Sequence, residues 1–330
     1  MRLAFDARVR PRSSFARVLA LFEEAARAVE LPWEEWRGGP CAAEVLWSVR
    51  QAEAPLPGAG GGPPRQVVTI YDVNPLLPDG RPAWQRWRRA RRFRRRAGAA
   101  LADAWRVVTS SEDARGRIEA AFPAAAGRCA VVPLYPEARF TPDGPPSTLA
   151  EPGYLLFLGA LRRHKNAAGL VRAYARLPAA LRRAHPLLLA GRAHRARRRL
   201  ARLLAALGLA GQVRLLDEVP EEELPGLYRG AAAFAFPSLA EGFGLPPLEA
   251  MACGTPVVAS DRTSLPEVLG GAAELVDPLD PAALAVALER VLADPAQAEA
   301  RRQAGLARAA AFGPAATGRA LRALLEDPSR

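Results

Sequence analysis

The chain has 330 residues, of which 50% are hydrophobic and 24% are charged, with a formal net charge of +12. This composition is typical of a globular protein and excludes a disordered or collagen-like chain, and at about 150 residues per domain the length predicts two domains. No apolar run approaches the ~18 residues of a membrane-spanning helix, and three cysteines and three histidines at wide spacing predict neither a disulfide framework nor a zinc site, so a reducing, cytoplasmic location is expected.

The first half of the chain alternates short apolar runs, typical of buried strands, with helical patterns. The predicted strands are 3–5, 44–49, 67–71, 107–109 and 130–134. Ser111 is expected to cap the helix after the fourth strand, because Glu112 and Asp113 then lie in the first turn, where the helix dipole favours acids. Glycine and proline predict a loop over 55–64, and residues 141–152 form the best candidate for a linker.

A second series of strands and helices follows this linker. The predicted strands are 154–158, 186–190, 213–216, 233–236, 257–260 and 273–276, and helices over 281–293 and 296–311 close the series. Strands that alternate with helices imply parallel sheets covered on both faces. The predicted fold is therefore α/β, with two Rossmann-like domains whose parallel sheets face an interdomain cleft. We assign 1–148 to the N-terminal domain and 149–312 to the C-terminal domain, and a final helix in 313–330 could cross back to the first.

Positive charge is concentrated in two segments. Residues 81–96 contain nine arginines and residues 152–216 contain thirteen arginines and Lys165, with no acid in either segment. Such patches attract polyanions, which include nucleic acid, anionic lipid and phosphorylated substrates. Lys165 is the only lysine in a chain with 45 arginines. Because a compact ammonium and a planar guanidinium are not interchangeable in a tight site, Lys165 is a candidate functional residue.

The stretch PSLAEGFGLPPLEAMACGTPVVASD, residues 237–261, carries the main chemical signal. A glycine-bearing loop enters a helix that begins near Pro246, and such a helix start presents backbone N–H groups to an anion. Glu241 precedes the loop and Glu249 is expected in the first helical turn, so the two carboxylates could flank one bound nucleotide. This spacing alone is weak evidence, since a glutamate in a first turn ordinarily stabilises the helix dipole.

The complete string closely resembles the signature of the retaining glycosyltransferases of family 4, the group 1 glycosyltransferases, which have the GT-B fold. Their signature is two glutamates separated by seven residues within EGFGLPxLEAMAxGxPVVAS. The segments YLLFLGALRRHKNAAGLVRAYARL (154–177) and SLPEVLGGAAELVDPLDPAALAVAL (264–288) also resemble this family. The resemblance is continuous over 153–311, moderate over 67–140 and weak over 1–40.

The resemblance implies a site for a nucleotide-sugar donor in the C-terminal domain, with no cofactor and no metal. Lys165 would neutralise the donor diphosphate, Glu241 would contact the transferring sugar, and Glu249 would bind the ribose. Lys165 and Glu241 are the implied catalytic residues. The other implied donor-binding residues are Gly159, Arg162, Arg163, His164, Val219, Gly242, Phe243, Gly244 and Leu245. Val219 would form a wall for the base, and the backbone N–H groups of 243–245 would meet the sugar and phosphates.

The N-terminal domain of the family binds the acceptor, here expected to be a glycan or a lipid-linked molecule, and this half departs from the family pattern. Tyr71-Asp72 stands where the family has a His-Asp pair, and Tyr71, Asp72 and Ser111 are the expected acceptor-side residues. One hypothesis is an active enzyme in which Tyr71 takes the place of the histidine. The other is a nucleotide-binding partner protein of another glycosyltransferase that has lost transfer activity. The intact donor half favours the first.

The donor is suggested by GALRRHKN together with SLPEV, which resemble the mannosyl- and deoxyhexosyl-transferring members that build bacterial surface polysaccharide. GDP-mannose is therefore the first expected donor, and a UDP- or dTDP-sugar stays open.

The arginine-rich segment 81–105 is predicted to be a helix and has three interpretations. Trp84 and Trp87 beside arginines favour a helix on the surface of an anionic membrane, with the protein peripheral to the inner face of the cytoplasmic membrane. A solvated helix with its tryptophans in the core is the second interpretation. Nucleic-acid binding comes last, because no groove-reading or RNA-binding motif accompanies the charge.

Overall fold

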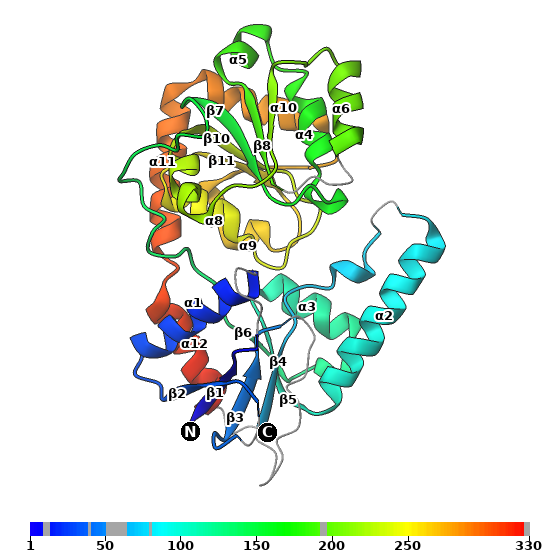
Figure 1. Cartoon of the computed structure of the whole chain (residues 1–330), viewed down its shortest axis with the longest axis vertical. Helices are drawn as coiled ribbons and strands as arrows, with labels where there is room; N and C mark the ends of the chain where they lie inside the picture. The colour runs from blue at the N-terminus through cyan, green and yellow to red at the C-terminus, as the bar shows by residue number, and fades with distance from the viewer. Residues whose placement is uncertain (9–13, 39–40, 51–64, 79–80, 192–196, 327–330) are drawn as a thin grey trace. The chain divides into compact units, whose positions relative to one another are not determined.

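The computed structural model describes residues 1–8, 14–38, 41–50, 65–78, 81–191 and 197–326 (Figure 1). The predicted loop over 55–64 lies outside these residues. The chain divides into two units, one made of Met1–Tyr135 with Phe312–Arg330 and the other of Pro136–Ala311. Within the described ranges, no helix is both long and apolar enough to cross a bilayer.

The division between the units falls at 135/136 rather than at the expected 148/149. The segment predicted as a linker is bound to the second unit, because Arg229 donates hydrogen bonds to the carbonyls of Thr141 (3.1 Å) and Pro145 (3.0 Å). Ser147 is buried and its hydroxyl donates to Glu223 at 2.6 Å. These bonds tie residues 141–147 to the second unit.

The first unit is a six-stranded parallel sheet in the order β2-β1-β3-β4-β5-β6. Its strands are β1 (Leu3–Asp6), β2 (Trp33–Trp36), β3 (Val45–Ser48), β4 (Arg65–Thr69), β5 (Ala104–Thr109) and β6 (Cys129–Val131). Its helices are α1 (Ser14–Ala28), η1 (Asn74–Leu76), α2 (Ala83–Ala102), α3 (Glu112–Ala121), η2 (Pro123–Ala125) and α12 (Pro314–Glu326). The continuous apolar runs predicted the five other strands, while the polar β2 (WEEW) was missed because it lacks such a run.

Helices cover both faces of this sheet, α1 and α12 on one and α2 and α3 on the other (Figure 1). The α2 residues Phe93, Ala97 and Leu101 pack on a core that includes Val68 and Val107. On the opposite face, α12 packs tightly on α1, since a Cβ added to Gly318 would lie 2.4 Å from the carbonyl oxygen of Ala25. The final helix is therefore an integral part of the first unit.

The second unit is also a six-stranded parallel sheet, in the order β12-β11-β10-β7-β8-β9. Its strands are β7 (Tyr154–Leu158), β8 (Leu187–Ala190), β9 (Val213–Leu216), β10 (Ala231–Phe236), β11 (Val257–Ser260) and β12 (Glu274–Val276). Its helices are η3 (Arg163–Lys165), α4 (Ala167–Tyr174), α5 (Ala179–Ala184), α6 (Arg197–Ala206), η4 (Glu221–Glu223), α7 (Leu224–Arg229), α8 (Leu245–Ala252), α9 (Leu265–Leu269), η5 (Gly270–Ala272), α10 (Pro281–Ala293) and α11 (Pro295–Ala310). The predicted strands of this half and the α/β fold class are confirmed.

Both sheets have a point at which the strand order reverses, and ligands in open parallel sheets bind beyond the carboxyl ends of the strands at that point. In the second unit the reversal lies between β7 and β10, and in the first unit it lies between β1 and β3. The loops that follow these four strands are therefore the expected positions of ligand-binding residues.

Candidate active site

The loop after β7 approaches the end of β8 very closely. The N–H of Gly159 donates to the carbonyl of Ala190 at 2.9 Å, and a Cβ on Gly191 would lie 2.2 Å from the carbonyl oxygen of Gly159. Both glycines have positive φ angles, +150° and +138°. A side chain on Gly191 would push the two backbones apart, and the positive φ angles favour glycine at both positions, where the loop leaves the sheet.

The same loop then positions Lys165 at the end of the short helix η3. Asn166 follows in a left-handed conformation (φ 55°), and its side-chain oxygen accepts a hydrogen bond from the N–H of Gly169 at 3.2 Å. Its amide nitrogen donates to the carbonyl of Pro278 at 2.7 Å. Asn166 therefore caps α4 and anchors the residue next to Lys165.

Lys165 and Glu241 meet at the reversal point between β7 and β10. The ammonium Nζ of Lys165 lies 2.7 Å from Oε1 of Glu241 and 4.8 Å from the centre of the Phe236 ring. The N–H of Leu239 donates to the carbonyl of His164 at 2.7 Å, so the two loops are also joined through their backbones. The side chains of Lys165 and Glu241 are 17% and 13% exposed, which leaves this charged pair partly accessible.

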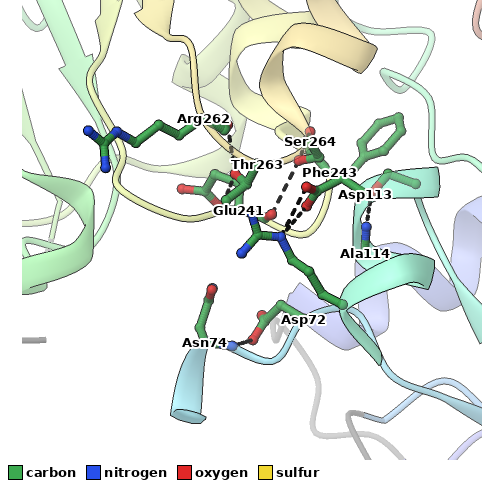
Figure 2. A network of polar contacts seen from close by, with 11 residues as sticks. Asp72, Asn74, Asp113, Ala114, Glu241, Phe243, Arg262, Thr263 and Ser264 are labelled. Atoms are coloured by element: carbon green, nitrogen blue, oxygen red, sulfur yellow. Dashed lines mark hydrogen bonds and ion pairs between the residues drawn. The ribbon is translucent and has the colours of Figure 1, made fainter. Parts of the chain in front are cut away.

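Two hydroxyls that follow β11 hold the Glu241 loop, as Figure 2 shows. The N–H of Glu241 donates to Oγ1 of Thr263 at 3.0 Å, and this hydroxyl donates to the carbonyl of Arg262 at 2.7 Å. Ser264 is fully buried, and its hydroxyl lies 2.9 Å from the carbonyl of Phe243 and 3.2 Å from that of Glu241. Thr263 has a φ of +59°, which is rare for a β-branched residue. We did not predict these two residues, although their place after a buried strand was a usable signal.

The loop 242–244 leads into α8, and the first turn of this helix has few backbone N–H groups that can donate hydrogen bonds. Gly244 is the N-cap with a φ of +103°, and a Cβ there would lie 2.5 Å from Leu265. Pro246 and Pro247 occupy the second and third helical positions and have no N–H. The N–H groups of Gly244 and Leu245 are therefore the ones that this helix start can offer to an anion.

Glu249 lies deeper than expected. It is the fifth residue of α8 and belongs to the second turn, so the prediction of a first-turn position was wrong. Only 2% of the residue is exposed, and the hydroxyl of Tyr228 donates to its Oε2 at 3.0 Å. Stabilisation of the helix dipole therefore does not explain this buried carboxylate.

Three of the other predicted donor-binding residues lie on the same loop as Lys165, and Val219 lies on a loop further along the sheet. Arg162 and Arg163 are exposed and His164 is half-buried on the Lys165 loop. Val219 follows β9, which is separated from β7 by β8. In the described residues, no group of three or more histidine, cysteine, aspartate or glutamate side chains is arranged to hold a metal ion.

The expected acceptor-side residues follow β4 and β5, but their polar groups bind the first unit itself. The hydroxyl of Tyr71 donates to the carbonyl of Val49 at 2.7 Å, and burial raises the pKa of this hydroxyl above its ordinary value. Asp72 accepts from the N–H of Asn74 at 2.8 Å. Ser111 is fully buried and caps α3, since its Oγ accepts from the N–H of Ala114 at 3.1 Å. The predicted cap is confirmed, and burial argues against an acceptor contact for Ser111.

A second charged cluster, which we did not predict, lies at the reversal point of the first sheet. Asp6 ends β1 with no exposed surface, and it accepts from Arg8 through Nε and Nη2, both at 2.8 Å, and from Nη2 of Arg50 at 3.2 Å. Burial would raise the pKa of Asp6, but the hydrogen bonds of Arg8 and the charges of both arginines hold it below its usual value. The guanidinium of Arg8 lies 4.2 Å from the centre of a Trp36 ring.

Comparison with known proteins agrees with this architecture. The family model described as "Glycosyl transferases group 1" matches residues 145–308. O-antigen chain mannosyltransferase B of Escherichia coli is 35% identical over 256 residues, which are 75% of this chain and 66% of the relative. HepE of Anabaena, solved with UDP and glucose, superposes with a TM-score of 0.75 at 17% identity and covers 98% of this chain and 99% of its own. WaaG, a glycosyltransferase involved in lipopolysaccharide biosynthesis, has a TM-score of 0.74 at 14% identity, with 99% and 100% covered.

The alignment with the Escherichia coli mannosyltransferase thus spans just under two thirds of that protein. The likeness to the solved structures extends over both units and concerns the fold. The family match and the 35% identity to the Escherichia coli mannosyltransferase show that the chain belongs to the group 1 glycosyl transferases, and the solved structures show that it has the GT-B fold.

Proposed function

We propose that this protein transfers a hexose from a nucleotide sugar to a glycan or lipid-linked acceptor in polysaccharide synthesis. Mannose from GDP-mannose is the first donor to test, because the relative from Escherichia coli is a mannosyltransferase. The proposal includes retention of the anomeric configuration and no requirement for a metal. The observation that carries it is the contact between Lys165 and Glu241 at the reversal point of the second sheet.

The proposed mechanism follows from the charges of the transition state. Transfer builds positive charge on the anomeric carbon and negative charge on the departing diphosphate. Lys165 and the N–H groups of Gly244 and Leu245 would stabilise this anion, since fixed donors need no reorganisation. Before the donor binds, Glu241 pairs with the ammonium of Lys165. The donor diphosphate then takes the place of Glu241 as the partner of this ammonium, and the Glu241 carboxylate faces the sugar. Glu249 would accept hydrogen bonds from the ribose hydroxyls, and a departing phosphate oxygen would take the proton of the acceptor.

Nucleotide binding is the most direct test of the donor site. GDP, UDP, dTDP, ADP and their sugar conjugates should be added without metal at saturating concentration, and the melting temperature measured. A ligand at ~100 times its Kd adds about 2.7 kcal/mol to the free energy of unfolding, so one nucleotide class should raise the melting temperature clearly. The same nucleotide should give a much smaller rise with Glu249→Gln. No rise with any nucleotide would contradict the donor site.

A nucleotide-binding partner protein without transfer activity is the second candidate function. The hydrogen bond of the Tyr71 hydroxyl to the Val49 carbonyl favours it, because this hydroxyl proton is then not offered to a sugar. The intact donor unit favours the active enzyme. A nucleotide that stabilises the protein without any sugar transfer or donor hydrolysis, across a panel of acceptors, would support the partner protein.

Thr263 should act as a positioning residue for Glu241. Thr263→Val keeps the branched shape and removes the hydroxyl, so the partly buried N–H of Glu241 loses its acceptor, at a cost of about 1–3 kcal/mol. We expect kcat for sugar transfer to fall about tenfold with Thr263→Val. Thr263→Ser keeps the hydroxyl and should retain most of the activity. Equal kcat values for the valine and serine variants would show that the Thr263 hydroxyl does not position Glu241 for transfer.

Helix α2 is proposed to bind an anionic membrane surface. Trp84 and Trp87 are 60% and 62% exposed, so the interpretation with tryptophans in the core is wrong. The guanidinium of Arg91 lies 5.5 Å from the centre of the Trp87 ring, and α2 contains no acidic residue. The stripe of exposed tryptophan and arginine lies away from the buried Phe93 and Ala97. Indole rings beside guanidinium groups match the interface of an anionic bilayer.

Sedimentation with vesicles should detect this contact. The protein should bind phosphatidylglycerol vesicles and not phosphatidylcholine vesicles, and salt should weaken the binding. The double variant Trp84→Ala/Trp87→Ala should weaken it by about tenfold or more, because it removes most of the apolar area of this face. Gln85→Ala on the same helix is the matched control. Binding that does not depend on anionic lipid would exclude the membrane interpretation.

A further inference from the structure

The reversal point of the first sheet has the features of an anion site. The order β2-β1-β3 places the residues that follow β1 and β3 side by side, and these residues include Arg8 and Arg50. Open parallel sheets bind ligands at this position, independently of the charges found there. In this unit the position is occupied by guanidinium groups around the buried carboxylate of Asp6.

Arg8 is held in one orientation. Two of its nitrogens donate to Asp6 at 2.8 Å, and its guanidinium carbon lies 4.2 Å from the centre of a Trp36 ring. Its side chain is nevertheless 24% exposed, and that of Arg50 is 29% exposed. A guanidinium fixed by a buried carboxylate loses little conformational entropy on binding, and its remaining N–H groups suit the oxygens of a phosphate.

Further positive charge in the first unit lies on α2. Burial and the charge of Arg50 lower the pKa of Arg96, a residue of α2, below its ordinary value. Arg96 also lines a groove of about 1040 Å³ along α2. The other groove residues are Pro75, Trp87, Arg88, Arg89, Arg91, Arg92, Phe93, Arg94 and Arg95. Helix α2 therefore adds positive charge to the unit that contains Arg8 and Arg50.

We infer that Arg8 and Arg50 form a subsite for a phosphate or diphosphate group carried by the acceptor. The inference rests on the proposed function, because it names the chemical class of the acceptor for the same reaction. The phosphate could belong to a soluble sugar phosphate or to a lipid-linked diphosphate. Asp6 is not a ligand in this subsite; it orients Arg8 and Arg50.

Binding of inorganic pyrophosphate, measured by isothermal titration with the full chain, tests the subsite without any turnover. The titration is made in the Lys165→Ala variant, so that the expected donor diphosphate site does not contribute. Arg50→Gln leaves both bonds between Arg8 and Asp6 in place and should weaken binding by about tenfold or more, as loss of a charge-assisted hydrogen bond does. Arg115 of α3 is half-buried and paired with Glu112, and Arg115→Gln is the matched control, which should change binding by less than about twofold.

If Arg50→Gln weakens pyrophosphate binding no more than Arg115→Gln does, or if pyrophosphate does not bind, the subsite is excluded. If Arg50→Gln does not fold, Arg8→Lys provides the same comparison, because lysine keeps a positive charge beside Asp6 and removes the planar guanidinium. This result is separate from the nucleotide titration, so a failure of the donor site and a failure of this subsite can be told apart.

The source of the phosphate is identified with vesicles. Phosphatidylcholine vesicles that carry polyprenyl diphosphate should bind the protein less well after Arg50→Gln if the acceptor is lipid-linked, while binding to phosphatidylglycerol vesicles stays unchanged. If Arg50→Gln weakens the binding of soluble pyrophosphate but not of these vesicles, the subsite takes a soluble sugar phosphate.

Discussion

Replacing Lys165 by alanine should lower the rate of sugar transfer by roughly 10²–10³ while the protein stays folded, because a preorganised charge at a developing anion has an effect of this size. Lys165 is the only lysine of the chain, and its ammonium lies 2.7 Å from Glu241 at the reversal point of the second sheet. The side chain is 17% exposed and packs over Phe236, so its loss should change the melting temperature little. The measurement is steady-state transfer from the donor that the nucleotide panel identifies, together with the melting temperature.

Two further variants give this prediction its specificity. Lys165→Arg keeps the charge but replaces a point charge by a wide planar fork, and we expect it to recover little of the activity. Arg172→Ala removes a positive charge from α4 in the same unit, where the guanidinium contacts only its own helix among the hydrogen bonds described, and it should leave the rate nearly unchanged. A Lys165→Ala protein with wild-type turnover would contradict the role of the ammonium.

Replacing Glu241 by glutamine should lower kcat by about 10² and change the affinity for the bare nucleoside diphosphate little, because the carboxylate is expected to contact the sugar rather than the diphosphate. The substitution keeps the size of the side chain and leaves the backbone bonds to Thr263 and Ser264 in place. A loss of activity would then report the charge of the carboxylate rather than its position.

Single-turnover measurements with saturating donor separate chemistry from binding for this variant. Glu222→Gln, at an exposed position of η4, is the matched control for the loss of one negative charge from the second unit. If Glu241→Gln raised KM for the nucleotide sugar and left kcat unchanged, Glu241 would be a binding residue without a part in the transition state.

The sequence predicted the strands of the second unit well, because the four central strands β7, β8, β10 and β11 are almost entirely buried and appear as continuous apolar runs. It missed β2, whose two central glutamates interrupt the apolar pattern. It also misplaced the boundary between the units. Residues 141–147 have the composition of a linker, but their carbonyls accept hydrogen bonds from Arg229, which lies more than 80 residues further along the chain.

The candidate site was only partly predictable. The resemblance identified Lys165, Glu241 and Glu249, but the contact between the first two joins residues 76 positions apart and depends on the strand order. The cluster around Asp6 was missed for the same reason, since Arg8 and Arg50 meet only through the pairing of β1 with β3.

The packing of α12 on α1 has a consequence for the order in which the protein folds during synthesis. The second unit is one continuous stretch of chain, 136–311, and all its strands and helices are synthesised before α12. The first unit begins earlier but ends later, because the buried Thr317 donates to the carbonyl of Pro133 and Gly318 fits against Ala25. The unit that is synthesised first is therefore the last to complete its core. Until then the apolar face of α1 stays uncovered, which makes the nascent chain a client for chaperones that recognise such surfaces.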